Sequence, residues 1–137
     1  MPDQILSLQV GVKALLKNKD NKYLFLRRNP EKYPGLGNSW DIVGGRIEPG
    51  TPLLENLKRE IKEETKLILE KTPHLVAAQD ILRPNKHVVR LTFVGEIDGE
   101  PVLDQDHIEY KWFSLEELKT LENLDSFFKE LLDANKF

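Results

Sequence analysis

Residues 44–67 have the sequence GGRIEPGTPLLENLKREIKEETKL. A glycine pair and Pro49-Gly50 precede a charged segment that carries three carboxylates within five residues, Glu60, Glu63 and Glu64. On a helical period of 3.6 residues these side chains cover an arc of about 100°. An apolar stripe beside that arc is expected to face a core; it consists of Leu54, Leu57, Ile61 and Ile68. The segment predicts a helix whose acidic edge adjoins its buried edge.

The acidic edge has two interpretations. Charged helices are commonly solvated faces with ion pairs, and Glu55/Arg59 and Arg59/Glu63 have the spacing for such pairs. However, Glu60 and Glu64 are like charges one turn apart, which costs an isolated helix about 0.2–0.5 kcal/mol. A hard divalent cation would remove that repulsion, because Mg²⁺ takes carboxylate, phosphate and water oxygens as ligands.

The glycine pair, Gly44-Gly45, allows the backbone to approach a bound group closely, since neither residue has a side chain in the way. Glycines ahead of a helix also suggest a phosphate loop. The stretch has no Gly-Lys-Ser/Thr ending and no G-x-G-x-x-G pattern, which argues against a P-loop and against a Rossmann unit.

Composition limits the class of protein. The 137 residues are 39% hydrophobic and 31% charged, which predicts a single globular domain over residues 1–137. The net charge of −3 gives no general attraction for nucleic acid polymers or for anionic membranes. The absence of cysteine excludes disulfides, zinc–thiolate sites and cysteine catalysis, and it suits the cytoplasm, the localisation that we expect. No signal peptide or membrane span is expected.

The rest of the chain alternates strand and turn patterns. Strands are predicted at 5–17, 23–28, 40–43, 73–82, 87–97 and 110–113, with a loop at 29–39. One helix is predicted from Thr51, its N-cap, to Lys66, and another from the capping box at Ser114. A third is predicted over 125–135, with an inward face of Phe127, Phe128, Leu131 and Leu132. We therefore expect an α+β fold, a mixed β-sheet between helices in α/β/α layers.

Residues 45–67 resemble the Nudix box, the signature of the Nudix (MutT-like) hydrolases. Its pattern is G-x5-E-x7-R-E-U-x-E-E-x-G-U, where U is a bulky aliphatic residue. Gly45 occupies the first position, residues 59–64 match the R-E-U-x-E-E core, and Leu67 occupies the last aliphatic position. The similarity extends to LFLRR at 24–28, to W-x-x-x-G-G at 40–45 and to WFSLEEL at 112–118. The resemblance covers most of the chain.

This resemblance implies the Nudix fold and Mg²⁺-dependent hydrolysis of a diphosphate linkage in a nucleoside diphosphate joined to another group, with Mn²⁺ as an alternative ion. Glu60 and Glu64 would be the main metal ligands. Glu63 would ligate a second ion or orient the attacking water. The carbonyl of Gly44 would complete the ligand shell, and Gly45 would support the box structurally.

Arg59 is the other expected support, and two positions around it depart from the family pattern. Thr51 stands where relatives carry a glutamate that usually pairs with the arginine, so Arg59 should be looser unless Glu48 or Glu55 substitutes. Lys66 stands where the family has a glycine just past the helix, a place where positive φ is common. Either lysine carries strain of about 1 kcal/mol there, or the helix ends differently.

In many relatives a further acid outside the box acts as the general base. The segment 104–109 is expected to supply it, with Glu109 preferred to Asp106, and the alternative is a polar surface turn. His107 in the same segment is expected to be an exposed loop residue.

Substrate contacts are expected from basic and aromatic side chains ahead of the box. Arg27, Arg28 and Lys13 would reach phosphates, and the alternative is ordinary charge at strand ends. Tyr33, in the predicted loop, would stack on a nucleobase, whereas Trp40 is expected to pack in the core.

Several alternatives stay open at this stage. The chain could be a non-catalytic Nudix-fold nucleotide-binding or regulatory module, or its acidic helix could be a protein-interaction face. Substrates of the (d)NTP type and of the ADP-ribose or nucleotide-sugar type are both compatible with the sequence. The number of metal ions is open, and so is a homodimer, which is common in the family but which no feature here demands.

Overall fold

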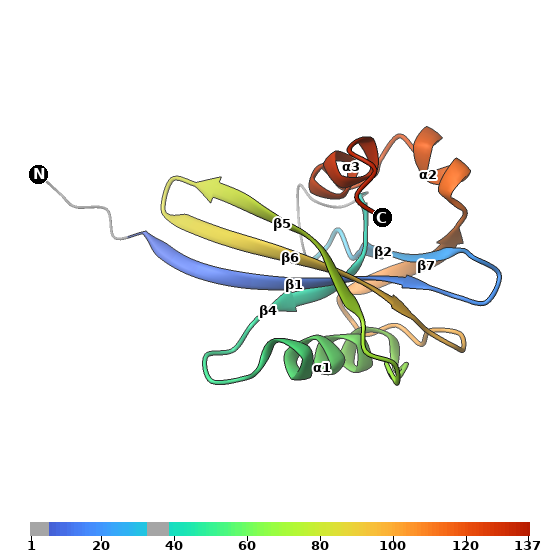
Figure 1. The fold of residues 1–137 in the computed structure, drawn as a ribbon, viewed down its shortest axis with the longest axis horizontal. Coiled ribbons are helices and arrows are strands. Elements are labelled where there is room, and N and C mark those ends of the chain that lie inside the picture. Colours follow the sequence, from blue (N-terminus) through green and yellow to red (C-terminus); the bar gives the residue numbers. More distant parts are fainter. Residues whose placement is uncertain (1–5, 33–38) are drawn as a thin grey trace, which may run out of the picture.

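The structure is a computed structural model that describes residues 6–32 and 39–137. Its strands are β1 (Ser7–Lys17), β2 (Tyr23–Arg28), β3 (Trp40–Asp41), β4 (Val43–Arg46), β5 (His74–Arg83), β6 (Lys86–Glu96) and β7 (His107–Phe113). Its helices are α1 (Leu53–Thr65), α2 (Leu115–Thr120) and α3 (Ser126–Asp133). Figure 1 shows their arrangement.

β1 lies at the centre of the sheet. Neighbouring strands follow the order β3-β2-β1-β6-β5, while β4 pairs with β1 and β7 pairs with β2. β1 and β6 are parallel, from the pair Ser7/Lys86 to the pair Lys17/Glu96. The other strand pairs are antiparallel. The sheet is therefore mixed, as the sequence predicted.

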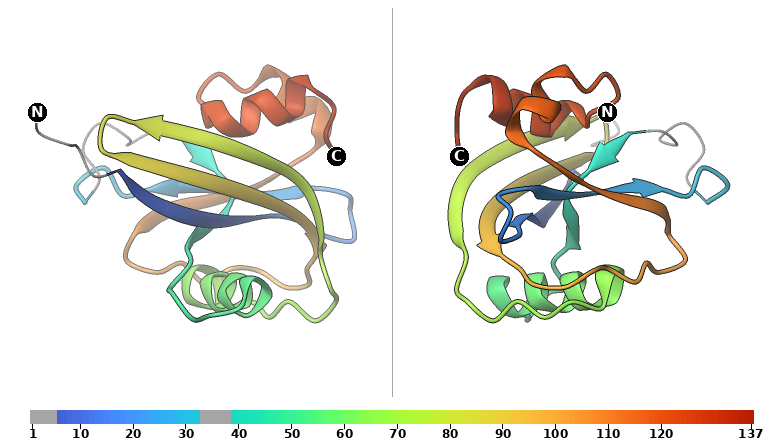
Figure 2. Two further views of the ribbon diagram at one scale, coloured as in Figure 1. Left: turned by 60° about the vertical axis from the view of Figure 1, so that its left-hand side comes forward. Right: turned by 90° about the vertical axis from the view of Figure 1, so that its right-hand side faces the viewer.

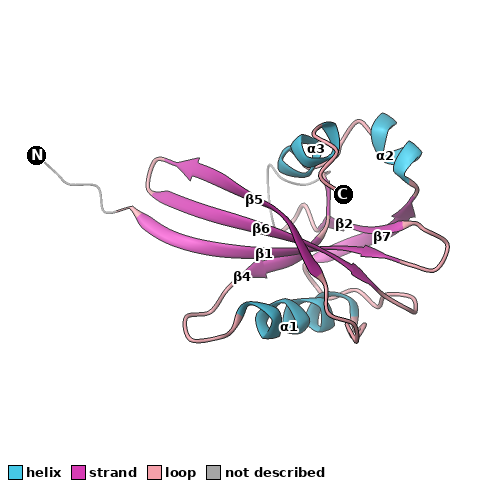
Figure 3. Cartoon of the chain, in the orientation of Figure 1, coloured by secondary structure: helices cyan, strands magenta, loops and turns pink. Residues whose placement is uncertain are grey.

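Helices cover both faces of this sheet. α1 lies on one face and α2 and α3 lie on the other, which Figures 1 and 3 show from one side and Figure 2 from two more. On the first face Leu57 and Ile61 of α1 pack with Val12 of β1. On the second face Phe128 of α3 packs with a cluster that includes the buried Trp40. The predicted α/β/α layering is confirmed.

The predicted strand at 40–43 is two strands. β3 pairs with β2 and β4 pairs with β1, so the chain changes partners at Ile42. Gly44 and Gly45 lie within β4 instead of following a strand. The sequence pattern missed this because two glycines carry no side chains from which a strand period could be read.

Helix α1 begins later than predicted. Pro52, and not Thr51, occupies the N-cap position, and no side-chain hydrogen bond caps the start of the helix. At the other end Thr65 is the last helical residue, and Lys66 adopts the left-handed conformation with φ of 63°. Of the two expectations for Lys66, the first is therefore confirmed: the lysine adopts the strained left-handed conformation just past the helix end.

The chain turns away from the helix axis after Lys66. Leu67 and Leu69 are buried there, whereas Ile68 is 64% exposed. The expectation that Ile68 continues the apolar stripe is wrong, because the helical period was extended past the end of the helix.

The C-terminal helices agree with the sequence in their caps. Ser114 and Glu117 form the predicted capping box of α2, and Asp125 caps α3 by accepting a hydrogen bond from the N–H of Phe128. Phe128, Leu131 and Leu132 are buried. Phe127 is only half-buried and lies against guanidinium groups, so its assignment to the inward face is corrected below. Among the helices in the described ranges, none has the length and apolar character that crossing a membrane requires.

The left-handed lysine leads to a test of stability. We expect Lys66→Gly to raise the free energy of unfolding by about 1 kcal/mol, because glycine adopts positive φ without the Cβ contact that lysine makes. Thermal unfolding followed by circular dichroism measures the change. Lys62→Gly in the interior of α1 is the matched control and should lower stability by about 1 kcal/mol. If Lys66→Gly lowered the free energy of unfolding as much as Lys62→Gly does, Lys66 would not be strained.

Candidate active site

Two carboxylates of α1 lie against the glycine pair of β4. A Cβ at Gly45 would come within 2.7 Å of the Glu60 carboxyl group, so a glycine is needed for Glu60 to approach the strand. Gly44 has φ of 152°, and a Cβ there would lie 2.0 Å from the carbonyl oxygen of Val12. The backbone N–H of Gly44 donates a hydrogen bond to Glu64. Gly45 therefore makes room for Glu60, while Gly44 lets β4 pair closely with β1 and offers its N–H to Glu64.

Arg59 is held in place although Thr51 replaces the usual glutamate. Its Nη1 lies 2.8 Å from Oε1 of Glu48, and its Nη2 donates to Oδ1 of Asn56 at 3.0 Å. Nη2 also lies 3.3 Å from Oε1 of Glu60. Glu48 thus substitutes for the missing glutamate, which was one of the two substitutions that the sequence allowed.

Asn56 joins the turn before α1 to the helix. It is fully buried, and its Oδ1 accepts from the N–H of Glu48 at 3.1 Å while its Nδ2 donates to the carbonyl of Arg46 at 3.3 Å. Sequence reasoning missed Asn56. Its position beside Leu57 on the buried edge of a helix was the available signal, because a buried amide needs specific partners.

The electrostatics of the two acids favour a bound cation. Burial raises the pKa of Glu64 to about 9, and the rise persists against the opposing charge of Lys13 because Glu60 adds repulsion. Burial also raises the pKa of Glu60, although its hydrogen bond to Glu64 works the other way. A carboxyl pair with raised pKa values retains a proton in the absence of a cation. Mg²⁺ or Mn²⁺ can take the place of that proton, because carboxylate oxygens are ligands that these ions bind.

The third acid of the box, Glu63, is more exposed than Glu60 and Glu64. Glu63 lines the same cleft but is exposed. Within residues 6–32 and 39–137, no three His, Asp or Glu side chains have already converged on one point that could hold a metal ion.

A β-bulge decides which side chains of β2 and β7 face the cleft. The register shifts between the pairs Arg27/Glu109 and Arg28/His107, so these pairs point to opposite faces of the sheet. Arg28 and His107 line the cleft. Arg27 instead forms an ion pair with Glu109 at 3.1 Å, and its guanidinium lies 5.5 Å from the ring of Trp40.

This arrangement places Arg27, a predicted phosphate contact, and Glu109, the preferred general base, away from the cleft. Neither residue lines the cleft, because each bonds the other on the far face of the sheet. The sequence could not show a one-residue bulge. Such a bulge changes the face of the sheet to which every later side chain on that strand points. Asp106, the less preferred acid, does line the cleft and lies 2.8 Å from Nζ of Lys32. Tyr33 lies outside the described residues.

His107 is also corrected. It is the first residue of β7 and its side chain is 11% exposed, so it is not an exposed loop residue. Its Nδ1 lies 2.7 Å from Oδ1 of Asp104, and its Nε2 lies 3.7 Å from Oε1 of Glu64. Sequence reasoning made Glu64 a metal ligand, made His107 a loop residue and gave Asp104 no role of its own, and the fold brings the three together.

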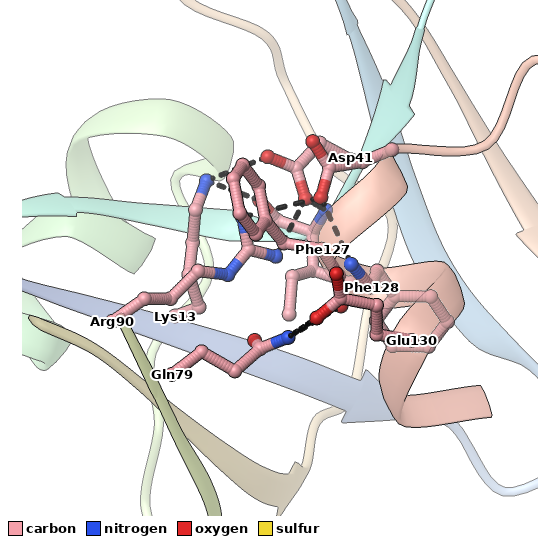
Figure 4. Close-up of polar contacts among 9 residues, drawn as sticks. Lys13, Asp41, Gln79, Arg90, Phe127, Phe128 and Glu130 are labelled. Carbon is pink, nitrogen blue, oxygen red and sulfur yellow. Dashed lines mark hydrogen bonds and ion pairs between the residues drawn. The ribbon is translucent and has the colours of Figure 1, made fainter. Parts of the chain in front are cut away.

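A cleft of about 940 Å³ extends from the acids of α1 to a second polar cluster at the start of α3. Lys13 lies 3.0 Å from Asp41, and Arg90 lies 3.1 Å from Asp41 and 3.2 Å from Asp125. Figure 4 shows Lys13 and Arg90 converging on Asp41. Hydrogen bonds between the backbones of Trp40 and residues 123 and 125 fix the helix start beside this cluster.

Phe127 forms an aromatic wall at this end of the cleft. The guanidinium groups of Arg90 and Arg83 lie 5.9 Å and 6.0 Å from its ring centroid. The side-chain amide of Gln79 donates to the carbonyl of Phe127 at 2.8 Å, which ties α3 to β5 (Figure 4). Phe127 thus faces the cleft, where the periodicity of α3 had indicated the core.

The buried ion cluster generates a pH-dependent prediction. Burial alone would raise the pKa of Asp41, but Lys13 and Arg90 together lower it well below the ordinary value of 3.8. A carboxylate with a lowered pKa stabilises the fold above its unfolded pKa, and that contribution is lost as the pH falls through the folded pKa.

We therefore expect Asp41→Asn to lower the free energy of unfolding by about 3 kcal/mol at pH 7, since it leaves Arg90 with a weaker partner in a buried site. The variant should also lose less stability than the wild type on acidification below about pH 4. Urea unfolding at several pH values measures both. Asp133→Asn, which removes the exposed pair with Lys129, is the control and should cost less than about 1 kcal/mol.

Known proteins show what this arrangement resembles. Residues 7–134 match the NUDIX domain. The chain is 34% identical over 114 residues to a protein named ADP-ribose pyrophosphatase from Methanocaldococcus jannaschii, an alignment that covers 82% of this chain but only 65% of that relative.

Solved structures agree with the fold. The MutT protein from Methanosarcina mazei Go1 superimposes with a TM-score of 0.83 at 29% identity, over 94% of this chain and 93% of that one. The MutT NUDIX hydrolase from Burkholderia pseudomallei gives a TM-score of 0.78 at 23% identity, over 93% and 97% of the two chains, and supports the fold alone. A match over nearly the whole length, with the box residues arranged around one cleft, means that the chain belongs to the Nudix family.

Proposed function

We propose that this protein is a Mg²⁺-dependent hydrolase that cleaves a diphosphate linkage in a nucleoside diphosphate joined to another group. The observation that carries the proposal is the pairing of the buried Glu64 with the partly buried Glu60 beside Gly44 and Gly45, at the wall of a large cleft. Two adjacent acids with little access to water are costly in isolation, and a divalent ion offsets that cost.

In this proposal Glu60 and Glu64 hold the ion, with the carbonyl of Gly44 as a further oxygen ligand. Glu63, exposed in the cleft beside them, holds a second ion or orients the attacking water. When bound, the ion neutralises charge on the phosphate oxygens and lowers the pKa of water. Arg59 keeps Glu60 in position through its contacts with Glu48 and Asn56.

The phosphates and the nucleoside would occupy the rest of the cleft. Arg28 and Arg46 line the cleft between the acids and the sheet, and they supply positive charge for a diphosphate. At the far end Phe127 offers an aromatic face, and Ile81 and Val88 of the adjoining strands are apolar. Such a wall suits the flat, weakly polar face of a nucleobase.

The substrate class is testable with a panel of compounds. ADP-ribose is the first compound to try, because the curated relative from Methanocaldococcus jannaschii is named for it. Nucleotide sugars, normal dNTPs and damaged dNTPs complete the panel, each with Mg²⁺ and with Mn²⁺. Product identification by chromatography should reveal a nucleoside monophosphate and a second phosphorylated product. No hydrolysis of any compound would contradict the enzyme assignment and favour a non-catalytic nucleotide-binding module.

We expect Glu64→Gln to reduce kcat by at least about 100-fold, because the amide cannot supply the charge that holds the ion at the reacting phosphate. Steady-state kinetics measures the loss, and circular dichroism checks the fold. Glu55→Gln, at an exposed position on the same helix, is the control and should retain activity. If Glu64→Gln were folded and fully active, the role of the carboxylate pair would be wrong.

A second prediction concerns the nucleoside. We expect Phe127→Ala to raise KM about 10-fold with little change in kcat, since stacking of a base on an aromatic ring contributes to binding and not to bond cleavage. Phe127→Tyr keeps the ring and is the matched control. An unchanged KM in the folded alanine variant would place the base elsewhere.

A further inference from the structure

His107 has the surroundings of a metal ligand. Its Nδ1 lies 2.7 Å from Oδ1 of Asp104, and since a carboxylate accepts hydrogen bonds, this contact puts the ring hydrogen on Nδ1. In the neutral imidazole, the form that binds a metal ion, the lone pair of Nε2 then faces Oε1 of Glu64 at 3.7 Å. Histidine ligands in proteins almost always donate their second ring N–H to a carboxylate, a carbonyl or water in this manner.

The distance between Nε2 and Glu64 fits two ligands of one ion better than a hydrogen bond. A hydrogen bond between these atoms would be about 2.7–3.2 Å long. Two donor atoms that each lie about 2.1 Å from the same ion are separated by about 3–4 Å, depending on the angle between them. The side chain of His107 is 11% exposed and that of Glu64 is 9% exposed, so both donors are held at the inner wall of the cleft.

We propose that His107 supplies an imidazole nitrogen to the ion held by Glu60 and Glu64, so that the site binds Mn²⁺ or Co²⁺ in preference to Mg²⁺. This inference rests on the proposed function for the presence of an ion at those two acids. Imidazole is a good ligand for transition metals, whereas Mg²⁺ takes oxygen ligands and gains little from nitrogen. Asp104 is the positioning residue, because it orients the ring through Nδ1.

The protein offers a matched control. His87 lies 2.7 Å from Oδ1 of Asp80 through its Nε2, so it makes the same kind of contact with a carboxylate. It lies near the β5–β6 turn and does not line the cleft. His87→Gln and His107→Gln therefore both remove an imidazole that bonds an aspartate. They differ because only the ring of His107 has Glu64 beside its second nitrogen.

The experiment measures metal binding without substrate. Isothermal titration with Mg²⁺, Mn²⁺ and Co²⁺ gives three affinities for the wild type and for each variant. We expect His107→Gln to weaken Co²⁺ and Mn²⁺ binding by about 10–100-fold and to change Mg²⁺ binding by less than about 3-fold. Asp104→Asn should shift the same preference in the same direction by a smaller factor. His87→Gln should leave all three affinities unchanged.

A direct readout comes from electron spin echo modulation of the Mn²⁺-loaded protein. A nitrogen ligand produces a ¹⁴N coupling, which should be present in the wild type and in His87→Gln and absent in His107→Gln. If His107→Gln does not fold, Asp104→Asn still tests the preference between metals. A wild type that lacks the ¹⁴N coupling, or variants that lose Mg²⁺ and Mn²⁺ binding equally, would overturn the proposal.

The outcome also separates this inference from the proposed function. Ion binding that depends on Glu64 but not on His107 would leave the hydrolase proposal intact and remove the nitrogen ligand. An absence of ion binding by the wild type would count against the metal-dependent function itself.

Discussion

The close pairing of the buried Glu64 with the partly buried Glu60 is the constraint on which the rest of the site depends. Two carboxylates with little access to water repel each other, and they persist there only if a proton or a cation lies between them. The approach of Glu60 to β4 requires glycine at position 45, and the pairing of β4 with β1 requires glycine at position 44, since a Cβ at Gly45 would meet Glu60 and one at Gly44 would meet the backbone of β1. The glycine pair and the acidic helix are therefore one structural unit.

The contacts of Arg59 show that a residue elsewhere in the chain can replace a missing ion-pair partner. The family pattern has, at the position of Thr51, a glutamate that usually pairs with the arginine. Here Glu48 reaches Arg59 from the preceding turn, and the buried Asn56 bonds both the turn and the arginine. The arginine has acceptors in both cases, which is what its guanidinium group requires.

The sheet connects the two ends of the cleft. β1 lies between β4, which carries the glycine pair, and β6, which carries Arg90. Lys13 of β1 bonds Asp41 of β3, and Arg90 links Asp41 to Asp125 at the start of α3. On the other side of the cleft, the bulge in the β2–β7 pair directs Arg28 and His107 inward and leaves Arg27 with Glu109 on the far face. A change in register of one residue thus selects which charged groups can meet a ligand.

The sequence by itself determined the mixed sheet, the layers, the acidic helix and the family, because alternation, capping residues and the spacing from Gly45 to Glu64 are local properties of the chain. It also located the departure at Lys66, since a position just past a helix end is readable from the pattern. Only the tertiary structure decided which side chains share the cleft. The bulge beside Arg28, the approach of His107 to Glu64 and the turn of Phe127 toward Arg83 arise from contacts between segments far apart in the chain, and no periodicity records such contacts.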